Sequence, residues 1–400
     1  MAQPLRTTVM WGLKIAVAIG LLAWVLWGVK WHDVVATAAG PSLAVTGARA
    51  TDAGLAVTTL DGGQVVLDWA SIVPAEGAAA APSAAAYVRP GFASALRGIR
   101  PSLLAAAVLC SLATVVGTAV RWRRLAAVQA VELSRWQAVR LTWMGAFFNY
   151  VIPGTTGGDL MKAWYAATHA PTRRMGSLVS VLMDRALGLA GLALLSAAML
   201  AGVAAAAAWF GLEAGYTGRL GPIAVGLAVL LAALAGGVVL VFSRRVREAL
   251  HLQKLYSRLP LAQYLRSADA ALARYRRAVG AVAGAMALTI AIHLLFVASI
   301  GLLGASLGAG IPWYQYAICV PLIYIIAAVP IVPGGVGLAE GLYVAVFAAW
   351  APESRILAMA LLARLVPMLL ALPGVLVAVG GPAHPSAARM KAELGADEAA

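Results

Sequence analysis

Long apolar runs separated by polar segments constrain this chain more than any other sequence feature. They cover about 9–29, 102–120, 137–152, 176–206, 220–243, 279–305, 314–332, 335–350 and 355–380. About 20 apolar residues in a helix are enough to cross the hydrocarbon core of a bilayer. Only 12% of the 400 residues are charged and 62% are hydrophobic, so we expect neither a water-soluble domain nor a disordered chain.

The run lengths predict an all-α polytopic membrane protein with about six full spans. These are expected at about 9–29, 102–120, 176–206, 220–243, 279–305 and 355–380. Residues 1–30 are interpreted as a retained first transmembrane helix, because their apolar stretch is longer than that of a cleaved signal peptide. Residues 101–380 then form the main membrane domain.

The polar segment 31–100 is predicted to hold a small extracytoplasmic β element and a linker. Leu55–Leu60 and Gln64–Trp69 alternate in polarity on either side of an Asp61-Gly62 turn, which predicts a β-hairpin. Residues 42–47 are a candidate third strand. Residues 75–86 are rich in Ala, Pro, Gly and Ser, a composition that is typical of a linker.

The net charge of +14 raises the question of a polyanionic partner. Segment 244–278 interleaves basic residues with leucines and tyrosines, which predicts a cytoplasmic surface helix on anionic lipid headgroups. Nucleic acid is disfavoured, because membrane spans flank this segment. With both termini and the 381–400 tail in the cytoplasm, the excess positive charge lies on the cytoplasmic side, as orientation in a bilayer requires.

Two Pro-Gly segments interrupt the apolar runs at corresponding places, Val151–Asp159 and Ile331–Glu340. Their helix-breaking residues are Pro153, Gly154, Gly157, Gly158, Pro333, Gly334 and Gly337. Pro removes a backbone donor and Gly relaxes the chain, so each helix is expected to break inside the membrane. Paired breaks of this kind indicate a transporter site. Chance kinks in a glycine-rich chain are the alternative.

Several ionisable residues fall at membrane depth, where charge is costly and usually functional. They include Asp159, Asp184 and Glu340 with Arg185 and Arg364. Structural ion pairing is the alternative, and Glu340 with Arg364 is a candidate pair across two helices. The spacing of the cysteines and histidines matches no metal or haem motif, so no metal and no cofactor are predicted.

An ordered set of motifs resembles a known family. The set comprises Arg121-Trp122-Arg123-Arg124-Leu125, Phe147-Phe148-Asn149, Pro153-Gly154 with Gly157-Gly158-Asp159, Met183-Asp184-Arg185, and Pro330–Glu340 with Arg364. Over roughly 100–380 the chain resembles the membrane domain of bacterial lysyl-phosphatidylglycerol synthase/flippase proteins. The resemblance implies two re-entrant helix hairpins, about 137–170 and 314–350, of opposite topology. The family's usual Arg after Gly-Gly-Asp is Lys162 here, and the β element is not part of the common pattern.

We therefore expect an inner-membrane lipid flippase or translocase that moves a phospholipid or a polyprenyl-phosphate-linked headgroup. The family's aminoacyl-transferase domain does not follow, so a transporter is expected rather than an enzyme. The expected substrate path comprises Asn149, Asp159, Lys162, Asp184, Arg185, Glu340 and Arg364. Acids would attract an amino headgroup and bases would hold a phosphate.

Two alternatives stay open. One is a membrane scaffold for a separate lipid-modifying enzyme, which would then be a protein partner. The other is a lipid-carrier-dependent transferase, disfavoured because no Asp-x-Asp or Asp-Asp sequence occurs. No Walker motif is present, so direct use of ATP is not expected.

Overall fold

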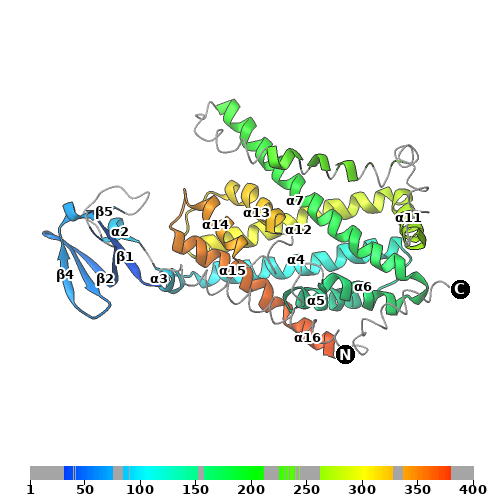
Figure 1. Cartoon of the computed structure of the whole chain (residues 1–400), viewed down its shortest axis with the longest axis horizontal. Helices are drawn as coiled ribbons and strands as arrows, with labels where there is room; N and C mark the ends of the chain where they lie inside the picture. Colours follow the sequence, from blue (N-terminus) through cyan, green and yellow to red (C-terminus); the bar gives the residue numbers. More distant parts are fainter. Residues whose placement is uncertain are drawn as a thin grey trace, which may run out of the picture.

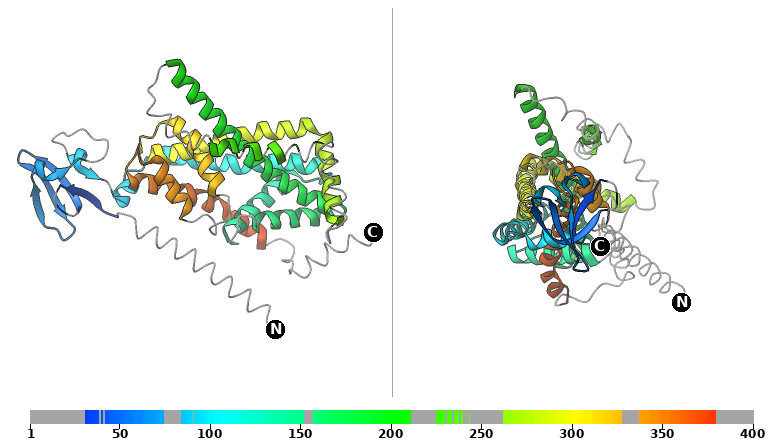
Figure 2. Two further views of the ribbon diagram at one scale, coloured as in Figure 1. Left: turned by 45° about the horizontal axis from the view of Figure 1, so that its top comes forward. Right: turned by 90° about the vertical axis from the view of Figure 1, so that its left-hand side faces the viewer.

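The computed structural model describes residues 31–74, 84–151, 157–210, 225–243, 262–327 and 337–379, apart from 39, 41, 90, 230, 234, 238 and 240–242. A small β-sheet at one end of the long axis is joined to a larger helical body (Figure 1). Helix α11 (Ala262–Arg277) lies at the opposite end of that body, and a second view shows the same separation (Figure 2).

The sheet is antiparallel, with the strand order β4-β3-β2-β1-β5 and β6 paired to β1. The strands are β1 (Asp33–Thr37), β2 (Leu43–Thr51), β3 (Gly54–Thr59), β4 (Gln64–Leu67), β5 (Ile72–Val73) and β6 (Val88–Arg89). The predicted hairpin is confirmed as β3 and β4, and Gly62 in its turn has a φ of 85°, a conformation that favours glycine. The third strand is present as β2, which is longer than expected.

Three features of this region differ from the prediction. Trp69 does not extend β4 but starts a short 3₁₀ turn, η1 (Trp69–Ser71), because the Asp68 carboxylate accepts the Ala70 N–H at 3.0 Å. Strands β1, β5 and β6 were not anticipated. Of the expected linker at 75–86, residues 75–83 lie outside the described residues, and its last three residues belong to the helix α2 (Ala84–Tyr87). The core of the sheet includes the buried side chains of Val35, Val45, Leu55, Val57, Ile72 and Tyr87.

Among the described residues, four helices are long and apolar enough to cross a bilayer, over Pro101–Val128, Arg174–Gly202, Val279–Ser306 and Glu353–Val377. They match four of the six expected spans. The expected span at 9–29 lies outside the described residues, and 220–243 is described only in pieces, with an apolar helix over Val225–Gly237. The helices are α3 (Phe92–Arg97), α4 (Pro101–Val128), α5 (Arg135–Val151), α6 (Gly157–His169), α7 (Arg174–Phe210), α12 (Val279–Ser306), α13 (Trp313–Ala327), α14 (Leu338–Phe347), α15 (Glu353–Ala371) and α16 (Pro373–Val379).

Two pairs of shorter helices occupy the segments expected to be re-entrant. In α5–α6 the longer helix has 17 residues, and in α13–α14 it has 15. At 1.5 Å per residue the described parts of these helices span roughly 26 Å at most, less than the ~30 Å hydrocarbon core. The α5–α6 pair lies in the half of the body nearer α11, whereas α13–α14 lies in the half nearer the sheet (Figure 1).

Small residues bring the long helices close together. The Ser111 and Ser299 hydroxyls lie 2.7 Å apart between α4 and α12. A Cβ placed on Gly191 of α7 would lie 2.4 Å from Cγ2 of Thr289 on α12, so only glycine fits this crossing. Close approach at small side chains is the usual packing mode of membrane helices, and it positions α4, α7 and α12 around the charged groups described next.

Candidate functional site: charged groups inside the helical body

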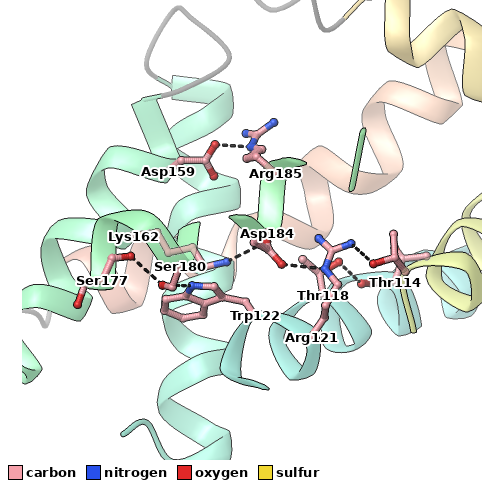
Figure 3. Close-up of polar contacts among 11 residues, drawn as sticks. Thr114, Thr118, Arg121, Trp122, Asp159, Lys162, Ser177, Ser180, Asp184 and Arg185 are labelled. Atoms are coloured by element: carbon pink, nitrogen blue, oxygen red, sulfur yellow. Dashed lines mark hydrogen bonds and ion pairs between the residues drawn. The ribbon is translucent and has the colours of Figure 1, made fainter. Parts of the chain in front are cut away.

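Asp184 on α7 joins two basic side chains from different helices (Figure 3). Its Oδ1 accepts from Nε of Arg121 on α4 at 2.7 Å, and its Oδ2 lies 3.7 Å from Nζ of Lys162 on α6. All three side chains are less than 10% exposed. We call Arg121, Lys162 and Asp184 the buried trio. With two cations and one anion, the trio sums to one positive charge.

Neighbouring side chains hold the trio in place. Lys162 Nζ lies 4.0 Å from the centroid of a Trp122 ring, a distance suited to a cation–π contact. The indole N–H of Trp122 donates to the Ser180 hydroxyl at 3.2 Å, which fixes the ring against α7. Arg121 also donates to the Thr289 hydroxyl at 3.1 Å, so α12 is tied to the same site.

A second ion pair, Asp159 with Arg185, lies beside the trio (Figure 3). We call it the outer pair, because the Arg185 side chain is 49% exposed and Asp159 is 20% exposed. Asp159 is in the first turn of α6 and Arg185 is on α7. The Arg185 Nε donates to a carboxylate oxygen of Asp159.

The start of α6 is held against α5 by a tight glycine contact. A Cβ on Gly158 would lie 1.9 Å from the carbonyl oxygen of Gly145, so no other residue fits without separating the helices. Asn149 of α5 accepts the Gly158 N–H at 3.0 Å. Since this N–H has no partner within its own helix turn, Asn149 acts as a cap that positions Asp159.

A third ion pair, Glu340 with Arg364, joins α14 to α15. The Arg364 Nε donates to Glu340 Oε1 at 2.5 Å, and its terminal nitrogen donates to Oε2 at 3.2 Å. Oε2 also accepts the backbone N–H of Gly337 at 2.8 Å. Gly337 precedes α14 with a φ of 82°, which explains why glycine stands there.

The two Pro-Gly segments therefore lead to the same local arrangement. Each is followed by a helix whose first turn carries an acid, Asp159 in α6 and Glu340 in α14. Each acid pairs with an Arg on a later helix, at sequence separations of 26 and 24 residues. An acid in the first turn is also favoured by the helix dipole.

Comparison with known families decides where the chain belongs. A family model for the lysylphosphatidylglycerol synthase TM region matches residues 90–374. The chain belongs to this family. No curated protein sequence matches it. The match covers the helices from α3 through α15, and it begins after the last residue of β6, so the sheet precedes the lysylphosphatidylglycerol synthase TM region.

Most of the predicted path residues are paired in this member of the family. Asp184 meets Lys162, Arg185 meets Asp159, and Arg364 meets Glu340. Asn149 contacts the backbone of α6 rather than a charged group. Of the helix-breaking residues, Gly157, Gly158 and Gly337 are described, and Pro153, Gly154, Pro333 and Gly334 lie outside the described residues.

Sequence reasoning missed the role of Arg121. It lies in a basic run near the end of an apolar helix, which suggests a cytoplasmic flank, yet its side chain is 6% exposed and bonded to Asp184. The family motif was the only sequence signal for it. In the described part of the chain, no group of three His, Cys, Asp or Glu side chains is arranged to hold a metal ion.

Proposed function

We propose that this protein is a lipid translocase that moves a phospholipid or polyprenyl-phosphate-linked headgroup across the inner membrane, and that it does so without being an enzyme. The observation that carries the proposal is the buried trio. Charges buried in an apolar helical body are costly and are retained mainly where they meet substrates or ions. The family, whose name refers to a lipid synthase, supports a lipid as the substrate.

The charge of the trio suggests how a headgroup would be held. Arg121 and Lys162 share a single carboxylate, Asp184. A phosphate bears the charge that balances the trio, and guanidinium and ammonium groups bind phosphate through charge-assisted hydrogen bonds. Asp159 and Glu340 are the acids that would meet an amino group on the same headgroup, by exchanging their present Arg partners.

We further propose that α5–α6 and α13–α14 are re-entrant hairpins that enter from opposite faces as an inverted repeat. Their short lengths and their places in opposite halves of the body support this (Figure 1). The end of the body that carries α11 would be cytoplasmic, because the last turn of α11 contains Arg274, Arg276 and Arg277. These arginines would face anionic headgroups, and both chain termini would lie on that side.

Reconstitution into vesicles tests the proposal. Fluorescently labelled lipids with anionic, zwitterionic or polyprenyl-phosphate headgroups are followed between leaflets with a membrane-impermeant quencher. We expect movement of at least one class to exceed that in empty vesicles. The triple variant Arg121→Met, Lys162→Met, Asp184→Leu should reduce that movement to background, whereas Asp269→Asn, at an ion pair on α11, should retain it.

Three outcomes would contradict the proposal. If wild-type vesicles match empty vesicles for every lipid class, the protein is not a translocase. Transfer activity that requires a divalent metal would indicate a lipid-carrier transferase. Loss of a partner enzyme's activity on deletion, with lipid movement unchanged, would indicate a scaffold.

A further inference from the structure

A pocket of about 230 Å³ lies between α4, α5 and α15. Its wall includes Thr114 and Thr118 of α4, Thr142, Trp143 and Ala146 of α5, and Pro367 of α15. Thr114 is at the midpoint of α4, so in a membrane-spanning helix the pocket would lie deep in the hydrocarbon core.

Most of this wall is apolar. The Thr114 hydroxyl donates to the Ser111 carbonyl at 2.6 Å, and the Thr118 hydroxyl donates to the Thr114 carbonyl at 2.8 Å. Both hydroxyl hydrogens are therefore used within α4. A dry apolar cavity of roughly 150 Å³ is enough to bind benzene, so a pocket of this size suits a hydrocarbon segment.

The surroundings indicate where such a segment would come from. Val116 and Met368 are next to lining residues in the sequence, and each is at least 40% exposed. Large apolar side chains on the outside of membrane-length helices face lipid. The bilayer therefore supplies hydrocarbon chains directly beside this pocket.

Thr142 makes the pocket more selective than an apolar surface. Its side chain is buried, and its hydroxyl has no hydrogen-bond partner among the described residues. The Trp143 indole N–H in the same wall also has no hydrogen-bond partner among the described residues. A buried donor without an acceptor is unfavourable, so an occupant with an oxygen acceptor has an advantage.

The pocket adjoins the charged groups of the proposed site. Thr118 is three residues before Arg121 on α4, so the two side chains lie on neighbouring turns of one helix face (Figure 3). At the other side, the lining residue Pro367 is three residues after Arg364 on α15. A chain in the pocket would thus have its headgroup near either ion-pair site.

We propose that this pocket binds the ester end of one acyl chain of a glycerol-based lipid, with Thr142 donating to the ester carbonyl. The inference rests on the proposed lipid translocation and narrows its substrate class. Acyl-ester lipids carry the carbonyl that Thr142 needs, whereas the prenyl chain of a polyprenyl phosphate has no oxygen acceptor.

Equilibrium binding to the purified full chain in detergent provides the test. The probes are a diester lipid and its diether analogue with the same headgroup and chain lengths, each bearing a photoreactive group near the linkage. We expect the wild-type protein to bind the diester roughly twofold to tenfold more tightly, the worth of one net hydrogen bond. Cross-links should map to α4, α5 and α15.

Two matched pairs of variants sharpen the test. Thr142→Val removes the unpartnered hydroxyl and should abolish the ester preference, whereas Thr168→Val, outside the pocket, removes a hydroxyl already bonded within α6 and should retain it. Ala146→Phe fills the pocket and should weaken binding of both probes several-fold. Ala291→Phe, on the exposed face of α12, should leave binding unchanged.

Equal wild-type affinities for the two probes, or unchanged binding by Ala146→Phe, would overturn this inference. Cross-links spread evenly over all lipid-facing helices would do the same. Since binding is measured without transport, these failures are distinct from failure of the proposed function. Lipid translocation without an ester preference would support the proposed function and refute ester binding in the pocket. Ester-selective binding without any translocation would support the pocket and refute the proposed function.

Discussion

Replacing Asp184 with Asn should be the most damaging single change in the buried trio. The carboxylate lies 2.7 Å from Arg121 Nε and 3.7 Å from Lys162 Nζ. At an effective dielectric constant near 20, unit charges 3.7 Å apart attract with roughly 4.5 kcal/mol before desolvation is counted. Breaking a buried ion pair by removing one partner costs about 3–5 kcal/mol, because a buried charge remains. Asp184→Asn leaves two such charges, so we expect the upper part of that range.

Removing one cation of the trio should lower the free energy of unfolding by less than Asp184→Asn does. In Arg121→Met, Asp184 retains Lys162 as its partner, so the loss is that of one charged hydrogen bond, about 1.5–3 kcal/mol. The triple variant Arg121→Met, Lys162→Met, Asp184→Leu removes all three charges together. Apolar replacement of a whole buried ionic group is often neutral for stability, so this variant should unfold close to the wild-type midpoint while losing lipid movement.

Denaturant unfolding of the purified proteins in one detergent would rank the variants. The expected order of stability is wild type and triple variant first, then Arg121→Met, then Asp184→Asn. Asp184→Asn within about 1 kcal/mol of wild type would show that the trio is solvated or neutral in the folded protein. A larger cost for Arg121→Met than for Asp184→Asn would refute the assignment of Asp184 as the shared partner.

Further expectations concern the helix starts and can be checked by thermal unfolding in the same detergent. Gly158→Ala places a Cβ 1.9 Å from the Gly145 carbonyl oxygen and should cost about 1–3 kcal/mol by overpacking. Its control Gly284→Ala, with nothing within 4 Å, should stabilise by about 0.5–1 kcal/mol; equal effects would contradict the contact. Glu340→Gln should lose the ion pair with Arg364 but keep the acceptor for the Gly337 N–H. Glu340→Ala should lower the free energy of unfolding by about 0.5–2 kcal/mol more than Glu340→Gln does. Identical unfolding midpoints for these two variants would argue against Glu340 as the cap of the Gly337 N–H.

Local sequence patterns predicted individual helices and strands better than they predicted which elements pair with one another. The Asp61-Gly62 turn predicted the hairpin because turn type and strand register are linked over a few residues. Strand β1 has no such signal, since its pairing with β2, β5 and β6 depends on residues up to 55 positions away. The four long helices followed from run length alone, because hydrocarbon thickness sets the number of apolar residues.

In the candidate site too, residues with a local sequence signal were predicted, whereas those that depend on contacts between distant helices were not. Asp159 and Glu340 were predicted because each follows a Pro-Gly segment and carries charge at membrane depth. Arg121 was not predicted from the residues alone, because a basic run at the end of an apolar helix usually marks an interface. Its burial depends on α7 lying alongside α4, which brings in Asp184 from 63 positions away. Lys162 was among the predicted path residues, but its contact with the Trp122 ring, which comes from another helix, was not predicted.

The two Pro-Gly segments differ in one respect that bears on mechanism. Each leads to an acid–arginine pair with no net charge, Asp159 with Arg185 and Glu340 with Arg364. Only the first has the buried trio beside it, so the half with α5–α6 carries an extra buried positive charge that the half with α13–α14 does not match among the described residues. A phosphate would therefore be held more strongly at the trio than at Glu340 and Arg364. If one headgroup binds alternately at the two pairs, this difference makes the site beside α5–α6 the tighter one. Neutralising the trio should then make the affinities of the two sites equal.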